Sequence, residues 1–109
     1  MTNETTFDFG YGPVPAHRHA NGGGWVADTA SVVEAAYVGR NARVYDKARV
    51  YGNAWVCGDA RVFGNAQVYD DARVYDDAQV CGNAQVSGNA WVCGDAQVYG
   101  NAQVYGDAL

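Results

Sequence analysis

A valine recurs at every sixth position of the chain from residue 26 to residue 104, without interruption. An alanine stands two residues before almost all of these valines. Residues two apart in a β-strand point to the same face, so each unit predicts a short strand with alanine and valine on its inner face. The residues beside valine are Arg, Gln or Trp before it and mostly Tyr or Cys after it, and we expect them to point outward.

Between these strands stand pairs such as Gly-Asn, Gly-Asp and Asp-Asp. These residue types tolerate a left-handed backbone and are typical of turns. Units this short leave no room for a hairpin or a helix between successive strands. The pattern therefore predicts an all-β coil of short parallel strands over residues 23–109, with each coil hydrogen-bonded to the next. We expect residues 1–22, which lie outside the repeat, to form an extended segment that caps the first coil.

The units, for example NAWVCG, DARVFG and NAQVYG, resemble the hexapeptide repeat of left-handed parallel β-helices. They are also similar to the tandem-hexapeptide proteins of bacteria and their phages. The resemblance spans residues 23–109 and implies a triangular, left-handed solenoid of three units per coil and about five coils. It further implies trimers packed side by side. This chain departs from the family pattern by placing mostly Tyr or Cys directly after the valine.

With three units per coil, residues eighteen apart form columns on three faces, and one face differs from the others. It collects Tyr37, Trp55, Arg73, Tyr75, Trp91 and Leu109. Soluble monomers seldom expose so contiguous an apolar patch, and the guanidinium of Arg73 is expected to stack on both tryptophans. Two interpretations stay open: a ladder of side chains that satisfy one another, or an interface with another copy, a protein partner or a sugar. We expect the other two faces to be solvated, with tyrosines stacked along the axis.

The chain has 109 residues and a net charge of −5, which indicates one domain and argues against direct binding of nucleic acid. Neither a signal peptide nor an apolar stretch long enough for a membrane span is evident. Cys57, Cys81 and Cys93 lack metal-ligand spacing and suggest free thiols. These features predict a cytoplasmic protein without membrane contact.

Two histidines, His17 and His19, are the candidate metal ligands, because side chains two apart in a strand point to the same side. A trimer would bring three such pairs together, whereas a simple polar turn is the alternative. In hexapeptide acyltransferases a histidine acts as general base on the coils or on a loop between them. This chain has no histidine after His19 and no insertion among its repeats. The resemblance therefore transfers no catalytic residue, and we expect no cofactor.

The sequence thus predicts a non-catalytic structural or binding module, derived from a phage or prophage. It would assemble with itself, as a trimer, or recognise a protein partner through its aromatic face. Two alternatives are an enzyme like the hexapeptide acyltransferases and an acidic inhibitor that occupies the nucleic-acid-binding groove of a host protein.

Overall fold

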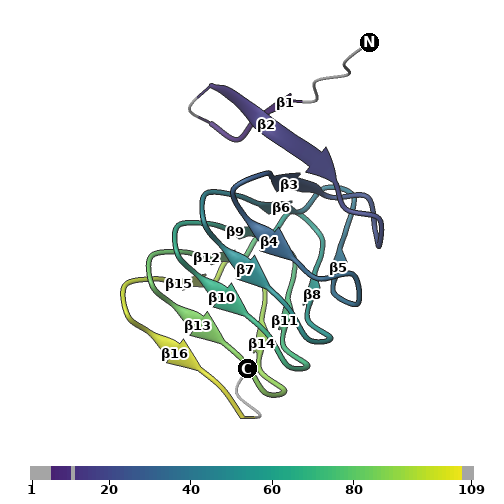
Figure 1. Cartoon of the computed structure of the whole chain (residues 1–109). Coiled ribbons are helices and arrows are strands. Elements are labelled where there is room, and N and C mark those ends of the chain that lie inside the picture. Colours follow the sequence, from purple (N-terminus) through teal and green to yellow (C-terminus); the bar gives the residue numbers. More distant parts are fainter. Residues whose placement is uncertain (1–5, 11, 107–109) are drawn as a thin grey trace.

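The computed structural model of the chain describes residues 6–10 and 12–106, and the strands among them form three sheets wrapped around one long axis (Figure 1). The first sheet is ordered β1 (Thr6–Asp8), β2 (Pro13–Arg18), β3 (Trp25–Ala27), β6 (Arg43–Val44), β9 (Arg61–Val62), β12 (Gln79–Val80) and β15 (Gln97–Val98). The second is ordered β4 (Ser31–Val32), β7 (Arg49–Val50), β10 (Gln67–Val68), β13 (Gln85–Val86) and β16 (Gln103–Val104). The third is ordered β5 (Tyr37–Val38), β8 (Trp55–Val56), β11 (Arg73–Val74) and β14 (Trp91–Val92).

Every parallel pair in these sheets joins residues eighteen positions apart. Val68, for example, lies opposite Val50 on one side and Val86 on the other. Three six-residue units therefore complete one coil. The chain is an all-β solenoid of stacked parallel strands, as the pattern predicted, and it has about four turns. The hand of the coil and the predicted number of coils stay predictions. The described residues contain no helix, so they include none that is long and apolar enough to cross a membrane.

The interior of the solenoid is built from alanine and valine alone over most of its length. Every repeat alanine and valine from Ala36 to Ala90 is fully buried. This confirms the predicted inner face, and it explains why alanine, which is small, and valine, which is β-branched, recur. A triangular coil with such short sides has room for one valine and one alanine per unit, and the three sides close on one another.

From Asp46 onward, the corners between strands have a left-handed backbone, which Gly or Asp supplies. Gly82, for example, has φ = 66°. Three aspartates take the same conformation, with φ values between 59° and 61°. Each accepts a hydrogen bond through its carboxylate from the backbone N–H of the glycine one coil further on. These pairs are Asp46 with Gly64 (3.1 Å), Asp70 with Gly88 (3.2 Å) and Asp76 with Gly94 (3.3 Å).

A β-hairpin covers the N-terminal end of the stack (Figure 1). Its second strand, β2, pairs antiparallel with β3 and so covers the edge that β3 would otherwise expose. The segment after β2 reaches the third sheet, where Gly24 N–H donates to the Val38 carbonyl at 2.9 Å and Val38 N–H donates to the Asn21 carbonyl at 3.1 Å. These contacts satisfy backbone groups that an open sheet edge would expose. Residues 1–5 and 11 of the predicted cap lie outside the described residues.

The hairpin also covers part of the outer face of the first sheet, which we expected to be solvated. Phe7 stacks on Trp25 with ring centroids 4.8 Å apart, and Phe9 stacks on Tyr45 at 4.7 Å. Tyr45 is only 5% exposed, and it stacks in turn on Phe63 at 4.9 Å. The expectation of a solvated face was wrong for these coils, because the aromatic side chains of the hairpin form a second apolar cluster outside the coil.

Candidate functional site

The aromatic face, defined here as Tyr37, Trp55, Arg73, Tyr75 and Trp91, lies on the third sheet. The parallel register brings its residues together, because Trp55 lies opposite Arg73 and Arg73 lies opposite Trp91. Tyr37 lies opposite Trp55 at the N-terminal end of the same sheet. Leu109, the sixth residue predicted for this surface, lies outside the described residues.

Arg73 lies between the two tryptophans, as the columns predicted. Its Cζ atom is 5.4 Å from the centroid of the Trp55 ring and 5.1 Å from that of Trp91. Both distances are within the range of a cation–π contact. Tyr37 extends the ladder, with its ring centroid 5.2 Å from that of Trp55. The side chains thus satisfy one another in part, but Trp55 remains 46% exposed and Trp91 37% exposed. The contacts expected of a ladder are therefore present, but part of the apolar surface of both tryptophan rings is open to solvent.

A hollow of about 400 Å³ follows the corner beside this face. Its walls are the two tryptophans and Arg73 together with three polar corner residues, Asn53, Asp71 and Asn89. The surface therefore combines an aromatic platform, one central cation and a rim of amide and carboxylate groups. Such a surface is suited to binding another molecule through ring stacking, charge and hydrogen bonds.

The pKa values of one thiol and one phenol on this face, those of Cys57 and Tyr75, are raised. Burial, and to a smaller extent the nearby carboxylate of Asp76, raises the pKa of Cys57 although Arg73 opposes the shift. A hydrogen bond with Cys93 raises the pKa of Tyr75. Because a thiolate is the reactive form of cysteine, these shifts argue against Cys57 as a nucleophile.

The two candidate metal ligands have separate partners. The Nδ1 atom of His17 lies 2.7 Å from Oδ1 of Asp28, and both side chains are about half exposed. His19 is buried, and its Nε2 atom lies 2.8 Å from the Ala36 carbonyl oxygen. β2 ends at Arg18, so His17 lies within the strand and His19 follows it. No group of three or more metal-ligating side chains occurs within residues 6–10 and 12–106, and metal binding by this pair stays a prediction.

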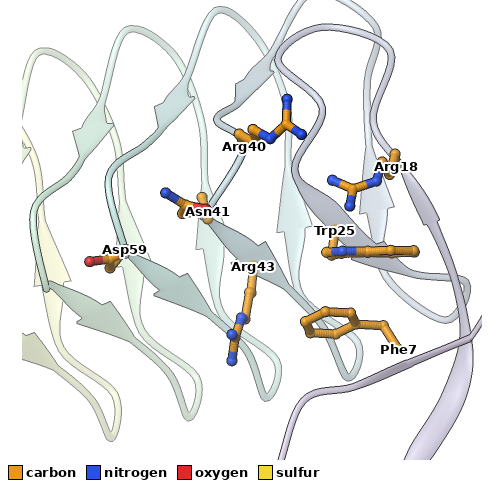
Figure 2. A pocket seen from close by; sticks show the side chains of 8 residues that line it. Phe7, Arg18, Trp25, Arg40, Asn41, Arg43 and Asp59 are labelled. Atoms are coloured by element: carbon orange, nitrogen blue, oxygen red, sulfur yellow. The ribbon is translucent and has the colours of Figure 1, made fainter.

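Sequence reasoning missed a second hollow, where the hairpin meets the first coils of the solenoid (Figure 2). Its lining includes Arg18, Arg40 and Arg43. A signal was present in the chain, since Phe7 and Phe9 alternate as two residues on one face of a strand do. That alternation indicates an apolar surface on the N-terminal segment, although it does not say what the surface covers.

The repeat itself matches a known family model, the YdcK beta solenoid repeat. The matching segments are residues 42–58, 54–68, 66–82, 78–94 and 96–109, which together cover more than half of the chain. This chain belongs to the YdcK beta solenoid repeat family. Searches of the curated proteins and of the solved structures found no match to it.

Membership of the YdcK beta solenoid repeat family agrees with the three parallel sheets and confirms the predicted solenoid. The narrower resemblance to hexapeptide β-helices is not tested by this match and stays a prediction. The matched segments include Trp55, Arg73 and Trp91, and they exclude the hairpin and β3. The aromatic face is therefore built on the family repeat, whereas the second hollow depends on residues outside it.

Proposed function

We propose that this chain is a non-catalytic structural module that associates with copies of itself through the aromatic face, with a trimer as the assembly. The proposal rests on one observation above all. Trp55 and Trp91 remain substantially exposed on either side of Arg73, on a regular parallel sheet. Trp, Tyr and Arg are the residue types that contribute most binding energy in protein interfaces.

The geometry supports association because the face is already ordered. Arg73 is held between two rings, and Tyr75 packs edge-on against Trp91 at a centroid distance of 6.0 Å. Side chains that are fixed before association lose less conformational entropy when a partner binds. Removing the exposed ring surface from water would then favour the complex.

The charges of the same surface favour a second copy as the partner. The lining of the hollow beside the face includes both the guanidinium of Arg73 and the carboxylate of Asp71. A surface with one charge of each sign can pair with another copy of itself, with Arg73 of one copy near Asp71 of the next. Such pairing would fix the orientation of the copies more than it would add affinity.

Light scattering across a concentration series tests the proposal, using the double variant Trp55→Gln/Trp91→Gln. We expect the unchanged chain to have three times its monomer mass of 11.6 kDa and this variant to be monomeric. The matched control is Tyr99→Gln/Tyr105→Gln, because these aromatic side chains are 65% and 68% exposed but lie outside the aromatic face. The control should keep the trimer. A monomeric unchanged chain, or equal dissociation of both variants, would refute self-association through this face.

Thiol labelling gives a second, independent test. Cys57 and Cys93 lie on the same face of the solenoid as the two tryptophans, and Cys81 lies on another. Because burial raises the pKa of Cys57, each cysteine must be compared with itself at low and high protein concentration. Protection of Cys57 and Cys93 at high concentration, with Cys81 unchanged, is the expected result. Equal behaviour of all three would contradict the proposed interface.

A further inference from the structure

The second hollow, here called the arginine pocket, lies where the hairpin, β3 and the first corners of the solenoid meet (Figure 2). It has a volume of about 220 Å³. Its lining residues are Phe7, Arg18, Trp25, Arg40, Asn41, Ala42, Arg43 and Asp59. The hairpin supplies Phe7 and Arg18, and the solenoid supplies the others, so the pocket exists only when the cap is docked.

Stacked rings fix two of the arginines in place. Arg18 lies over Trp25, with Cζ 4.6 Å from the ring centroid, and Phe7 stacks on Trp25 at 4.8 Å. Arg43 lies over Phe7, with Cζ 5.0 Å from its centroid. Arg18 also donates a hydrogen bond from Nη1 to the Gly23 carbonyl at 2.9 Å. These contacts leave further N–H donors of each guanidinium free for a ligand.

The third arginine, Arg40, approaches the pocket from the solenoid, and Figure 2 shows its guanidinium extending toward that of Arg18 above Trp25. Within the described residues it makes no hydrogen bond, ion pair or ring contact. None of the three arginines has a carboxylate of the described residues within ion-pair distance. Among the described residues of the lining, Asp59 is the acidic one.

This concentration of positive charge contrasts with the rest of the molecule. The chain contains seven basic residues against twelve acidic ones, and three of the seven line this one pocket. Like charges that share a small volume repel one another, and a bound anion would remove that repulsion. Guanidinium groups match the geometry of phosphate, because each can donate two parallel hydrogen bonds to one anion.

We propose that the arginine pocket binds a phosphate group, held chiefly by Arg18 and Arg40 with Arg43 adding positive charge. The volume accommodates a phosphate together with a small organic substituent. The amide of Asn41 and the carboxylate of Asp59 are the polar groups available to that substituent, and they are suited to hydroxyl groups. The ligand class is therefore a small phosphate monoester that carries hydroxyls, and the free phosphate ion shares its anionic part. The site is independent of the aromatic face.

Nuclear magnetic resonance titration tests the proposal, with the indole N–H of Trp25 as the reporter. The probes are inorganic phosphate and glycerol 3-phosphate, with sodium chloride at equal ionic strength as the reference. We expect saturable shifts with both phosphates and none beyond a linear salt effect with chloride. Tighter binding of glycerol 3-phosphate would assign the organic part to Asn41 and Asp59. Shifts that follow ionic strength alone would overturn the proposal.

Arginine variants distinguish a specific phosphate site from nonspecific electrostatic attraction. Arg40→Gln and Arg18→Gln should each weaken phosphate binding at least roughly tenfold, since each removes a charged donor. Arg49→Gln is the matched control, because it removes the same charge from an exposed position on the second sheet. It should change the affinity less than about twofold.

Arg18 also packs on Trp25, so its replacement could loosen the hairpin. Arg40 makes no such contact, and Arg40→Gln therefore decides the question. If Arg40→Gln binds phosphate as the unchanged chain does, or if Arg49→Gln loses as much affinity, the arginine pocket is not a phosphate site.

Discussion

The corner glycines of the solenoid allow a sharp test of what holds successive coils together. Gly82 has φ = 66°, and a Cβ atom added there would lie 2.8 Å from the backbone nitrogen of Gly100, one coil further on. Alanine at this position would adopt a left-handed backbone, which costs about 1–2 kcal/mol, and would also push against the next corner. We expect Gly82→Ala to lower the free energy of unfolding by about 2 kcal/mol.

Aspartate at the same position should be tolerated better than alanine. Asp46, Asp70 and Asp76 occupy equivalent corners, and each accepts a hydrogen bond from the glycine N–H one coil further on. In Gly82→Asp the carboxylate would accept the N–H of Gly100 in the same way, which returns about 1 kcal/mol. The expected loss is therefore about half that of alanine, although aspartate is the larger residue.

A substitution at Gly94 measures the free-energy cost of the left-handed backbone apart from the steric clash between neighbouring corners. Gly94 has φ = 63°, but no atom of the described residues lies within 4 Å of a Cβ placed there. Gly94→Ala should show the conformational cost alone, about 1–2 kcal/mol. Urea unfolding followed by circular dichroism gives the three values, provided that the transition remains a single step with an unchanged slope. The reasoning is refuted if Gly82→Asp is as destabilising as Gly82→Ala, or if Gly94→Ala costs nothing.

Three further predictions concern the core, the cap and a thiol. Val68→Asp should abolish folding, because it places an unpaired charge at a fully buried position, and a native circular dichroism spectrum with normal melting would contradict this. The N–H groups of Gly10 and Gly12 donate to Asp8 and lower the pKa of its carboxyl group. Asp8 should therefore stabilise the hairpin at neutral pH and lose that contribution as the pH falls through its lowered pKa. Amide shifts of both glycines should report the change, and Asp8→Asn should remove it. Alkylation of Cys57 by iodoacetamide should require a higher pH in the folded chain than in urea, because burial raises its pKa; identical pH profiles would refute this.

The coil was predictable because its interactions repeat. Each strand meets a copy of its own pattern eighteen residues away, so one unit such as that of Val68 indicates the burial of the other units that have a coil on both sides. The stacking of Arg73 on Trp55 and Trp91 follows from the same register. Predicting these features requires only the six-residue period and the geometry of a parallel sheet.

The cap and the arginine pocket were not predictable in this way. Residues 1–22 share no period with the coils, so nothing in the sequence sets the register of β2 against β3. The burial of Tyr45 depends on Phe9, and the position of Arg18 over Trp25 depends on where the hairpin docks. Such contacts arise from the shapes of side chains far apart in the sequence.

The eighteen-residue register also constrains how a chain of this kind can change in length. Every unit supplies the same alanine and valine to the interior, so a duplication or loss of six residues would leave the core intact. Placed between Arg73 and Trp91, such a change would nevertheless rotate all later units by one face and separate Trp91 from Arg73 and Trp55. A duplication of eighteen residues would preserve both the core and the columns. Evolution can therefore rearrange the surface in six-residue steps while the interior is unchanged, and conserves a surface only when length changes by whole coils.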